Sequence, residues 1–255
     1  MAGRNRGNRM FPLWERFGVA IHSEPKQLER SESKPEQSFG ATIGGWMTCK
    51  VAILIDGGFL KSRLKEVHRK FPTGSDIVKY CDNVMKSEQL KNDELFRIYY
   101  YDCWPYHGQV TNPVDGQLMD CSSTAAALNG EQFLKELSLK PKVAFRKGEL
   151  SYEGWRIESQ KIRKVLDKIN RGGRIEPDDF KIDLKQKRVD IKIGLDIAWL
   201  SSKRIVDKIV LVTSDTDFIP AIKFARREGL IVFLCPMRQT VNQDLVIHSD
   251  DVINV

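Results

Sequence analysis

The sequence predicts a three-layer α/β fold with a mainly parallel central sheet and an inserted β-hairpin. Short apolar runs at residues 51–55, 209–214 and 231–235 contain no charged residue. Such runs are typical of strands that are buried on both faces of a parallel sheet. Stretches with helical spacing separate these runs along the chain. Strands that alternate with helices build a parallel sheet with helices on both faces.

Length and composition are those of a soluble globular protein, since the 255 residues are 41% hydrophobic and 29% charged. The formal net charge of +7 indicates an anionic partner, of which nucleic acid is the usual one. The five cysteines are widely spaced and form no CxxC pair. We therefore expect buried thiols in a reducing cytoplasm, without a disulfide framework or a zinc site. No apolar run approaches the roughly 20 residues of a membrane span, so no membrane partner is expected.

Residues 1–48 show no sustained period and are rich in Ser, Glu, Lys and Gly. We expect a flexible leader with a short helix near residues 11–17. Met47 falls just before the first convincing strand and is a candidate translation start. A leader without apolar periodicity does not offset its ordering entropy, so deletion of residues 1–46 is expected to leave the fold intact. Residues 49–255 are expected to form one domain.

The first half of this domain is expected to run strand, two helices, strand. The run at 51–55 ends in Asp56 and two glycines, which let backbone or a ligand approach closely. Helices are expected at 59–71 and 76–91, and an aromatic-rich strand at 96–103. An insertion at about 106–184 is expected to contain a helix at 131–139, a hairpin at 143–155 that turns at Gly148, a basic helix at 160–169 and a strand at 180–184.

The stretch at 186–200 is predicted to be a helix that packs on the sheet. Its apolar stripe consists of Val189, Ile193, Ile197 and Leu200. Asp190 lies in the first turn, at one margin of the stripe. Asp196 is six residues further on, roughly 120° around the helix, and we expect it to be a packing residue or a supporting acid behind the site.

The strand at 209–214 ends at Asp215 and Asp217, and a helix is expected at 218–228 before the last strand. Two acids spaced i, i+2 point to the same side of extended backbone. They lie where a parallel strand ends and a helix begins, the edge at which α/β proteins bind ligands. A simpler interpretation makes Asp217 an N-cap and Asp215 a turn residue.

Asp56, Asp190, Asp215 and Asp217 are therefore expected to meet at one edge of the sheet. Neighbouring carboxylates repel one another, and a hard divalent cation such as Mg²⁺ removes that penalty. Such a site can activate water and stabilise charge on a phosphodiester. Each acid also has a structural interpretation, since Asp56 can shape a turn and Asp190 can complement a helix N-terminus.

Three stretches resemble the NYN domain family, the PIN-like nucleases that include the LabA-like proteins. They are VAILIDGGF, QKRVDIKIGLDIA and IVLVTSDTDFIPAIKFARREG, and the resemblance covers about residues 50–255. It implies a PIN-like fold and a metal-dependent ribonuclease, expected to be an endoribonuclease, that uses Mg²⁺ or Mn²⁺ on RNA. It also implies that Asp56, Asp190, Asp215 and Asp217 are the catalytic and metal-binding residues.

The resemblance places Lys187 where the family has a lysine that contacts a phosphate or the scissile group. Arg188 and Ser214 are expected to contact substrate as well, although many members have Gly in place of Ser214. A second departure is Phe59, where many members have Asn, so one polar ligand or substrate contact is missing. Lys187 has a simpler interpretation as a solvated surface lysine.

Other classes fit less well. IDGGF at 55–59 is not the G-x-G-x-x-G of a Rossmann domain, and Gly58 stands where a haloacid dehalogenase has a second Asp. A non-catalytic RNA-binding or regulatory module on the same fold stays open as the alternative. The basic helix at 160–169 is expected either to track a phosphate backbone or to be a solvated face. Aromatic residues at 99–101, 104 and 106 are expected either to stack on bases or to pack in the core.

Overall fold

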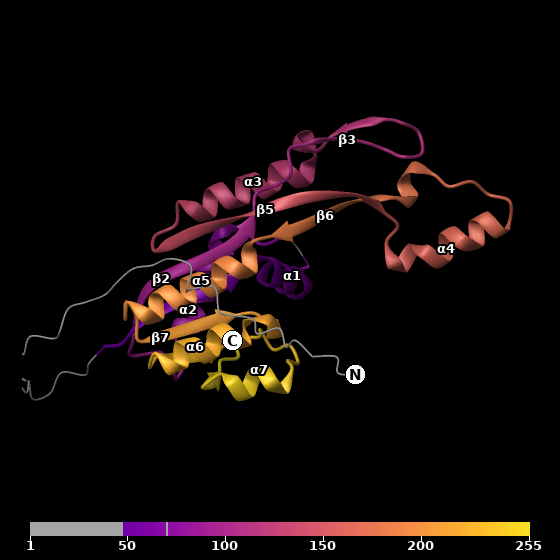
Figure 1. The fold of residues 1–255 in the computed structure, drawn as a ribbon. Helices are drawn as coiled ribbons and strands as arrows, with labels where there is room; N and C mark the ends of the chain where they lie inside the picture. Colours follow the sequence, from indigo (N-terminus) through magenta and orange to yellow (C-terminus); the bar gives the residue numbers. More distant parts are fainter. Residues whose placement is uncertain (1–47, 70) are drawn as a thin grey trace, which may run out of the picture. The chain divides into compact units, whose positions relative to one another are not determined.

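A seven-stranded sheet in the order β6-β5-β2-β1-β7-β8-β9 forms the centre of the computed structural model, which describes residues 48–69 and 71–255 (Figure 1). Every strand pair in it is parallel except β5–β6. The predicted, mainly parallel sheet is therefore confirmed. The strands are β1 (Lys50–Asp56), β2 (Glu94–Cys103), β5 (Val143–Arg156), β6 (Lys181–Lys187), β7 (Lys208–Val212), β8 (Ile231–Leu234) and β9 (Asp251–Val252).

Helices cover both faces of the sheet, which confirms the predicted three layers. Alternate residues of β1 point to opposite faces: Ile53 joins one apolar cluster and Leu54 the other. The cluster around Ile53 includes residues of α1 (Gly57–His68), α2 (Gly74–Met85) and α3 (Ala125–Ser138). The cluster around Leu54 includes residues of α5 (Val189–Ser202), α6 (Ile219–Arg227) and α7 (Gln243–His248).

Capping side chains set the starts of the helices. Thr73 and Asp76 form a capping box at the start of α2. Thr124 accepts a hydrogen bond from the amide of Ala127, so α3 begins six residues earlier than predicted. In α5 all four residues of the predicted stripe are buried, although the helix starts at Val189 because the preceding residues belong to β6.

The hairpin predicted to turn at Gly148 is wrong. β5 is one continuous strand that pairs with β2 up to Gly148 and then with β6 from Glu149 onward. A Cβ at position 148 would lie 2.5 Å from Cγ2 of Val189 and 2.8 Å from Sγ of Cys103. The glycine is therefore needed for close packing, where the strand changes partner, and not for a turn. The second half of β5 and β6 form an antiparallel ribbon (Figure 1).

The remaining elements lie outside the central sheet and its covering helices. The insertion contains a small hairpin of β3 (Gln109–Thr111) and β4 (Leu118–Asp120), and helix α4 (Ser159–Asn170) lies beyond the end of the ribbon (Figure 1). The described residues also include three 3-10 helices: η2 (Cys121–Ser123), η3 (Pro177–Asp179) and η4 (Thr216–Phe218). All five cysteines are free, and four of them are buried.

The predicted leader, including its helix at 11–17 and Met47, lies outside the described residues except for Thr48. The described residues all belong to one compact unit. Within this part of the chain, no helix is both long and apolar enough to cross a membrane.

Candidate active site

Asp56 ends β1 at the carboxyl edge of the sheet. Its Oδ1 accepts a hydrogen bond of 3.2 Å from the amide of Phe59, so the same carboxylate is the N-cap of α1. Phe59 packs against the core beside it. The side chain that replaces the family's frequent Asn therefore serves packing and offers no polar group to the site.

Asp215 and Asp217 follow the end of β7, which is the parallel neighbour of β1. Asp215 caps η4, because its Oδ1 accepts a hydrogen bond of 2.9 Å from the amide of Asp217. The N-cap is thus Asp215, whereas the simpler interpretation assigned that role to Asp217. Both side chains are exposed, and both lie at the edge where Asp56 ends β1.

Asp190 lies in the first turn of α5. This turn also lies at the carboxyl edge, because its neighbour Val189 packs near Cys103, the last residue of β2. The αL conformation of Arg188, with φ of 68°, makes the sharp change of direction from β6 into the helix. Three separate segments thus bring acids to one edge of the sheet.

Electrostatics link these acids. Loss of hydration raises the pKa of Asp56, and the negative charge of Asp190 raises it further. Loss of hydration also raises the pKa of Asp190, with added contributions from the charges of Asp215 and Asp217. At Asp56 and Asp190 the charges of neighbouring acids thus add to the effect of burial.

The donor set suits a hard divalent cation, because all four side chains offer carboxylate oxygens. Among the described residues, no group of three His, Cys, Asp or Glu side chains is arranged to hold a metal ion. Mg²⁺ does not require such a group: it keeps several waters and binds through one or two carboxylates together with substrate phosphates. The residues present therefore fit a cation that shares its shell with solvent and substrate.

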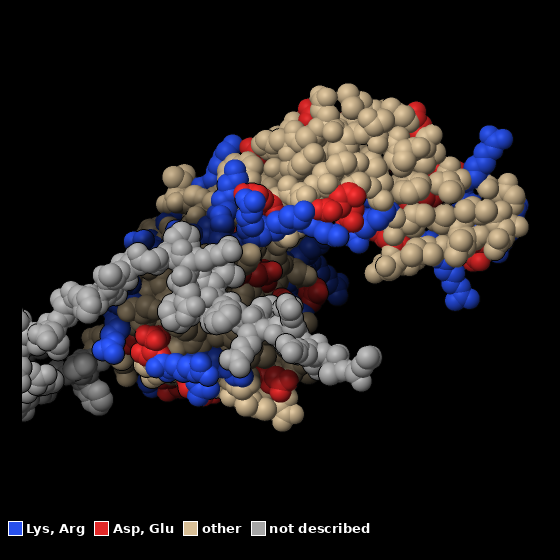
Figure 2. All heavy atoms as spheres, in the orientation of Figure 1, with Lys and Arg blue, Asp and Glu red and all other residues tan. Residues whose placement is uncertain are grey.

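The three predicted substrate contacts surround this edge. Lys187 ends β6, and its Nζ lies 2.7 Å from Oε1 of Glu153 and 3.0 Å from Oγ of Ser151. Arg188 forms an ion pair of 2.5 Å with Glu149. Ser214 is half-buried between β7 and η4. In Figure 2 basic and acidic side chains alternate along the band that the ribbon occupies in Figure 1, so these cations already have intramolecular partners.

Asp196 is placed differently from the other acids. It lies two turns further along α5, where it accepts hydrogen bonds from the guanidinium of Arg146 at 2.9 Å and from the hydroxyl of Tyr101 at 2.8 Å. This carboxylate is the main charge beside Tyr101, whose pKa rises through burial and then through Asp196. Asp196 therefore joins α5 to β2 and β5 on the covered face of the sheet.

Asp102 is an acid at this edge that sequence reasoning missed. It stands at the carboxyl end of β2, is 1% exposed, and lies 2.6 Å from Nζ of Lys61. Its negative charge also contributes to the raised pKa of Asp56. The amide of Gln186 donates to its Oδ1 at 3.5 Å. Its position directly after a run of three tyrosines at a strand end is the sequence feature that could have identified it.

The aromatic and basic residues considered as RNA contacts are in part buried and in part already paired within the protein. Tyrosines 99, 100 and 101 are at most 2% exposed, so they belong to the core and cannot stack on bases. Tyr106 is half-buried and stacks on Tyr152 with ring centroids 6.1 Å apart. In α4, Lys168 is paired with both Glu176 and Asp179, so part of the basic helix is neutralised within the protein.

Comparison with known proteins identifies one family. Residues 50–255 match the family model described as NYN domain. A comparison with curated proteins gave no match. Among solved structures, the chain is similar to a protein of unknown function from Vibrio parahaemolyticus, with 16% sequence identity and a TM-score of 0.43. That similarity covers 82% of this chain and 93% of the other.

Proposed function

Because this chain belongs to the NYN domain family, whose members generally have a PIN-like nuclease fold, we propose that it is a metal-dependent ribonuclease. It hydrolyses RNA phosphodiester bonds, as an endonuclease, at the carboxyl edge of its sheet. Asp56, Asp190, Asp215 and Asp217 are the catalytic residues of this proposal.

The observation that carries the proposal is the mutual influence of these acids. The charge of Asp190 raises the pKa of Asp56, and those of Asp215 and Asp217 raise the pKa of Asp190. A cluster of like charges at an open edge costs folding free energy, which a bound cation would offset. A purely structural role for the acids would favour side chains with cationic partners, as Asp196 has in Arg146.

In this proposal Mg²⁺ or Mn²⁺ would bind among the four aspartates, through one or two carboxylates at a time together with waters and substrate phosphates. Such a cation supplies a water of lowered pKa and stabilises the charge that develops on the phosphate. The protein's own contribution is position: β1, β7 and α5 bring acids of three separate segments to one edge. The caps formed by Asp56 and Asp215 restrain those two carboxylates before any substrate arrives.

Lys187, Arg188 and Ser214 are proposed to contact the substrate beside the acids. A phosphate would compete with Glu153 for Lys187 and with Glu149 for Arg188. The side chains of Lys187 and Arg188 are both more than half exposed, so these ion pairs are weak. Exchanging the carboxylate for a phosphate therefore costs little free energy. The same cations thus keep the edge from being strongly negative toward an approaching RNA.

The direct experiment incubates the full chain with single-stranded RNA, structured RNA and DNA, each with Mg²⁺, Mn²⁺ or chelator. The proposal expects RNA cleavage that requires the metal and yields internal fragments. Absence of metal-dependent RNA cleavage under all conditions would contradict it.

A second candidate is a non-catalytic RNA-binding or regulatory module. The observation that favours it is the apolar packing of Phe59 at a position where a polar side chain is frequent in the family. This candidate expects RNA binding without cleavage, and binding that survives Asp215→Asn. The cleavage assay therefore separates the two candidates.

A further inference from the structure

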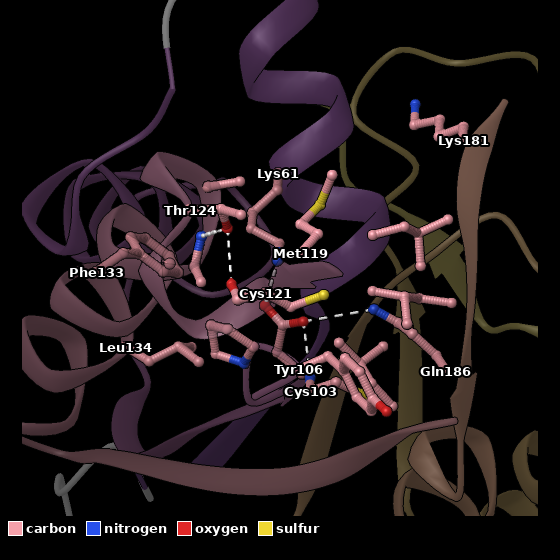
Figure 3. A pocket seen from close by; sticks show the side chains of 18 of the residues that line it. Lys61, Cys103, Tyr106, Met119, Cys121, Thr124, Phe133, Leu134, Lys181 and Gln186 are labelled. Carbon is pink, nitrogen blue, oxygen red and sulfur yellow. Dashed lines mark hydrogen bonds and ion pairs between the residues drawn. The ribbon is translucent and has the colours of Figure 1, made fainter. Parts of the chain in front are cut away.

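A largely apolar pocket of about 570 Å³ lies between α3 and the β5–β6 ribbon (Figure 3). Its volume is within the range typical of small-molecule sites, roughly 300–1,000 Å³. Aromatic rings contributed by separate segments line it: Phe71, Tyr106, Phe133, Trp155 and Phe180. None of these residues belongs to the acid site, so the proposed hydrolysis leaves this cavity without a role.

The pocket adjoins the candidate active site. Lys61, Asp102 and Gln186 are part of its lining, and in Figure 3 the amide of Gln186 points into it toward the Asp102 carboxylate. A Cβ at Gly58 would lie 3.4 Å from Oδ1 of Asp56 and 3.5 Å from Oε1 of Gln186. Gln186 therefore lies close to Asp56 and also lines the cavity, so the two sites are neighbours.

We propose that this pocket binds one unstacked base of the RNA whose backbone lies at the acid site. The inference rests on the proposed function. A nucleobase combines the two properties that the cavity selects, a flat ring with exposed π faces and edge atoms that accept hydrogen bonds. The aromatic lining supplies stacking surfaces, and Gln186 supplies an amide at the end nearest Asp56.

The pocket thus gives the enzyme a preference for single-stranded RNA. A base in a duplex is held in its stack, whereas a base in a single strand or a loop is free to turn outward. The base that enters is a near neighbour of the bond that is cut, since the cavity and the acid site share the region around Gln186 and Asp102.

The test measures base stacking and needs no cleavage. Short single-stranded RNAs carry 2-aminopurine at one position each, and the full chain is titrated with chelator present and again with Ca²⁺. We expect quenching of 2-aminopurine at one or two positions. Phe71→Ala removes a ring that is 51% exposed, and Ala126→Trp fills the cavity from an exposed helix position. Each should weaken binding about tenfold or more and abolish the quenching.

Leu128→Ala is the matched control, because Leu128 lies on the same helix as Ala126, is 55% exposed and does not line the pocket. It should bind as the wild type does. Equal binding by all three variants, or quenching at no position, would overturn the pocket as a base site even if RNA cleavage stands. Position-specific quenching without any metal-dependent cleavage would support the base site and contradict the nuclease.

Discussion

The ammonium of Lys61 lies 2.6 Å from the carboxylate of Asp102, an acid that is only 1% exposed. This ion pair joins α1 to the end of β2, close to Asp56 and in the lining of the aromatic pocket. The hydroxyl of Tyr100, at 3.4 Å, and the amide of Cys103, at 2.8 Å, also donate to Asp102. The pair therefore holds α1 against the end of β2, where the acid site and the pocket meet.

Lys61→Ala should destabilise the protein by about 3 kcal/mol, because it leaves a buried carboxylate without its cation. Urea unfolding measures the change. Lys65→Ala on the same helix is the control, since Lys65 is exposed, and it should change stability by less than about 0.5 kcal/mol. Equal stability of the two variants would show that hydrogen bonds alone satisfy Asp102.

Gly148→Ala should cost about 1–3 kcal/mol, because its methyl group would collide with Val189 and Cys103. Gly194→Ala is the matched control: nothing lies within 4 Å of its Cβ, and alanine favours the helix. That variant should gain about 0.5–1 kcal/mol. Thermal or urea unfolding of both variants measures the two changes in stability. A stabilising Gly148→Ala would contradict the tight crossing of β5, β2 and α5.

Asp190→Asn should stabilise the metal-free protein at neutral pH. A raised carboxyl pKa means that the folded state binds protons more tightly than the unfolded state, so stability falls as pH rises above the ordinary value of 3.8. The gain from the amide should therefore be full at pH 7 and shrink toward pH 4. Unfolding in chelator over this range measures it. A pH-independent loss of stability would mean that Asp190 acts mainly through the helix dipole.

In saturating Mg²⁺ the wild type should be more stable than Asp190→Asn, the reverse of the order expected without metal. A cation that binds only the folded state stabilises it in proportion to its affinity, and Asp190→Asn lowers the affinity. The wild type should then unfold at the higher urea concentration. The same order with and without Mg²⁺ would count against a metal at this edge.

Lys187→Ala should weaken binding of single-stranded RNA and reduce the slope of log K against log salt by about 0.7, the value for one lost phosphate contact. Glu153→Gln should strengthen RNA binding and steepen its salt dependence, because it releases Lys187 from its 2.7 Å ion pair. Lys203→Ala is the control, since Lys203 ends α5 far from the strand ends that carry the acids. Fluorescence anisotropy over a salt series measures all three, and an unchanged slope for Lys187→Ala would make it a solvated lysine.

The sequence was sufficient to predict the parallel sheet and the segments that carry the acids, because buried parallel strands are short, apolar and end at polar turns. It was insufficient where burial depends on distant partners. The burial of Asp102 could not be predicted, because its cation, Lys61, comes from another element, although its place at a strand end was visible in the sequence. The turn expected at Gly148 was wrong because a glycine needed for packing has the same local pattern as one needed for a turn. α7 and β9, with six and two residues, are too short to show a period.

The central claim is that the acids hold a cation for RNA hydrolysis, and Asp215→Asn tests it most directly. Asn keeps the shape and the capping bond at the start of η4 but removes a negative charge that attracts the metal. Asp167→Asn is the control, because Asp167 is an exposed acid on α4.

The measurement is the initial rate of cleavage of single-stranded RNA with Mn²⁺ and with Mg²⁺, together with urea unfolding of each variant. The account predicts that Asp215→Asn loses about 100-fold or more in rate while its unfolding free energy stays equal to or above that of the wild type. Asp167→Asn should cleave as the wild type does. Cleavage by Asp215→Asn at the wild-type rate would contradict the metal mechanism.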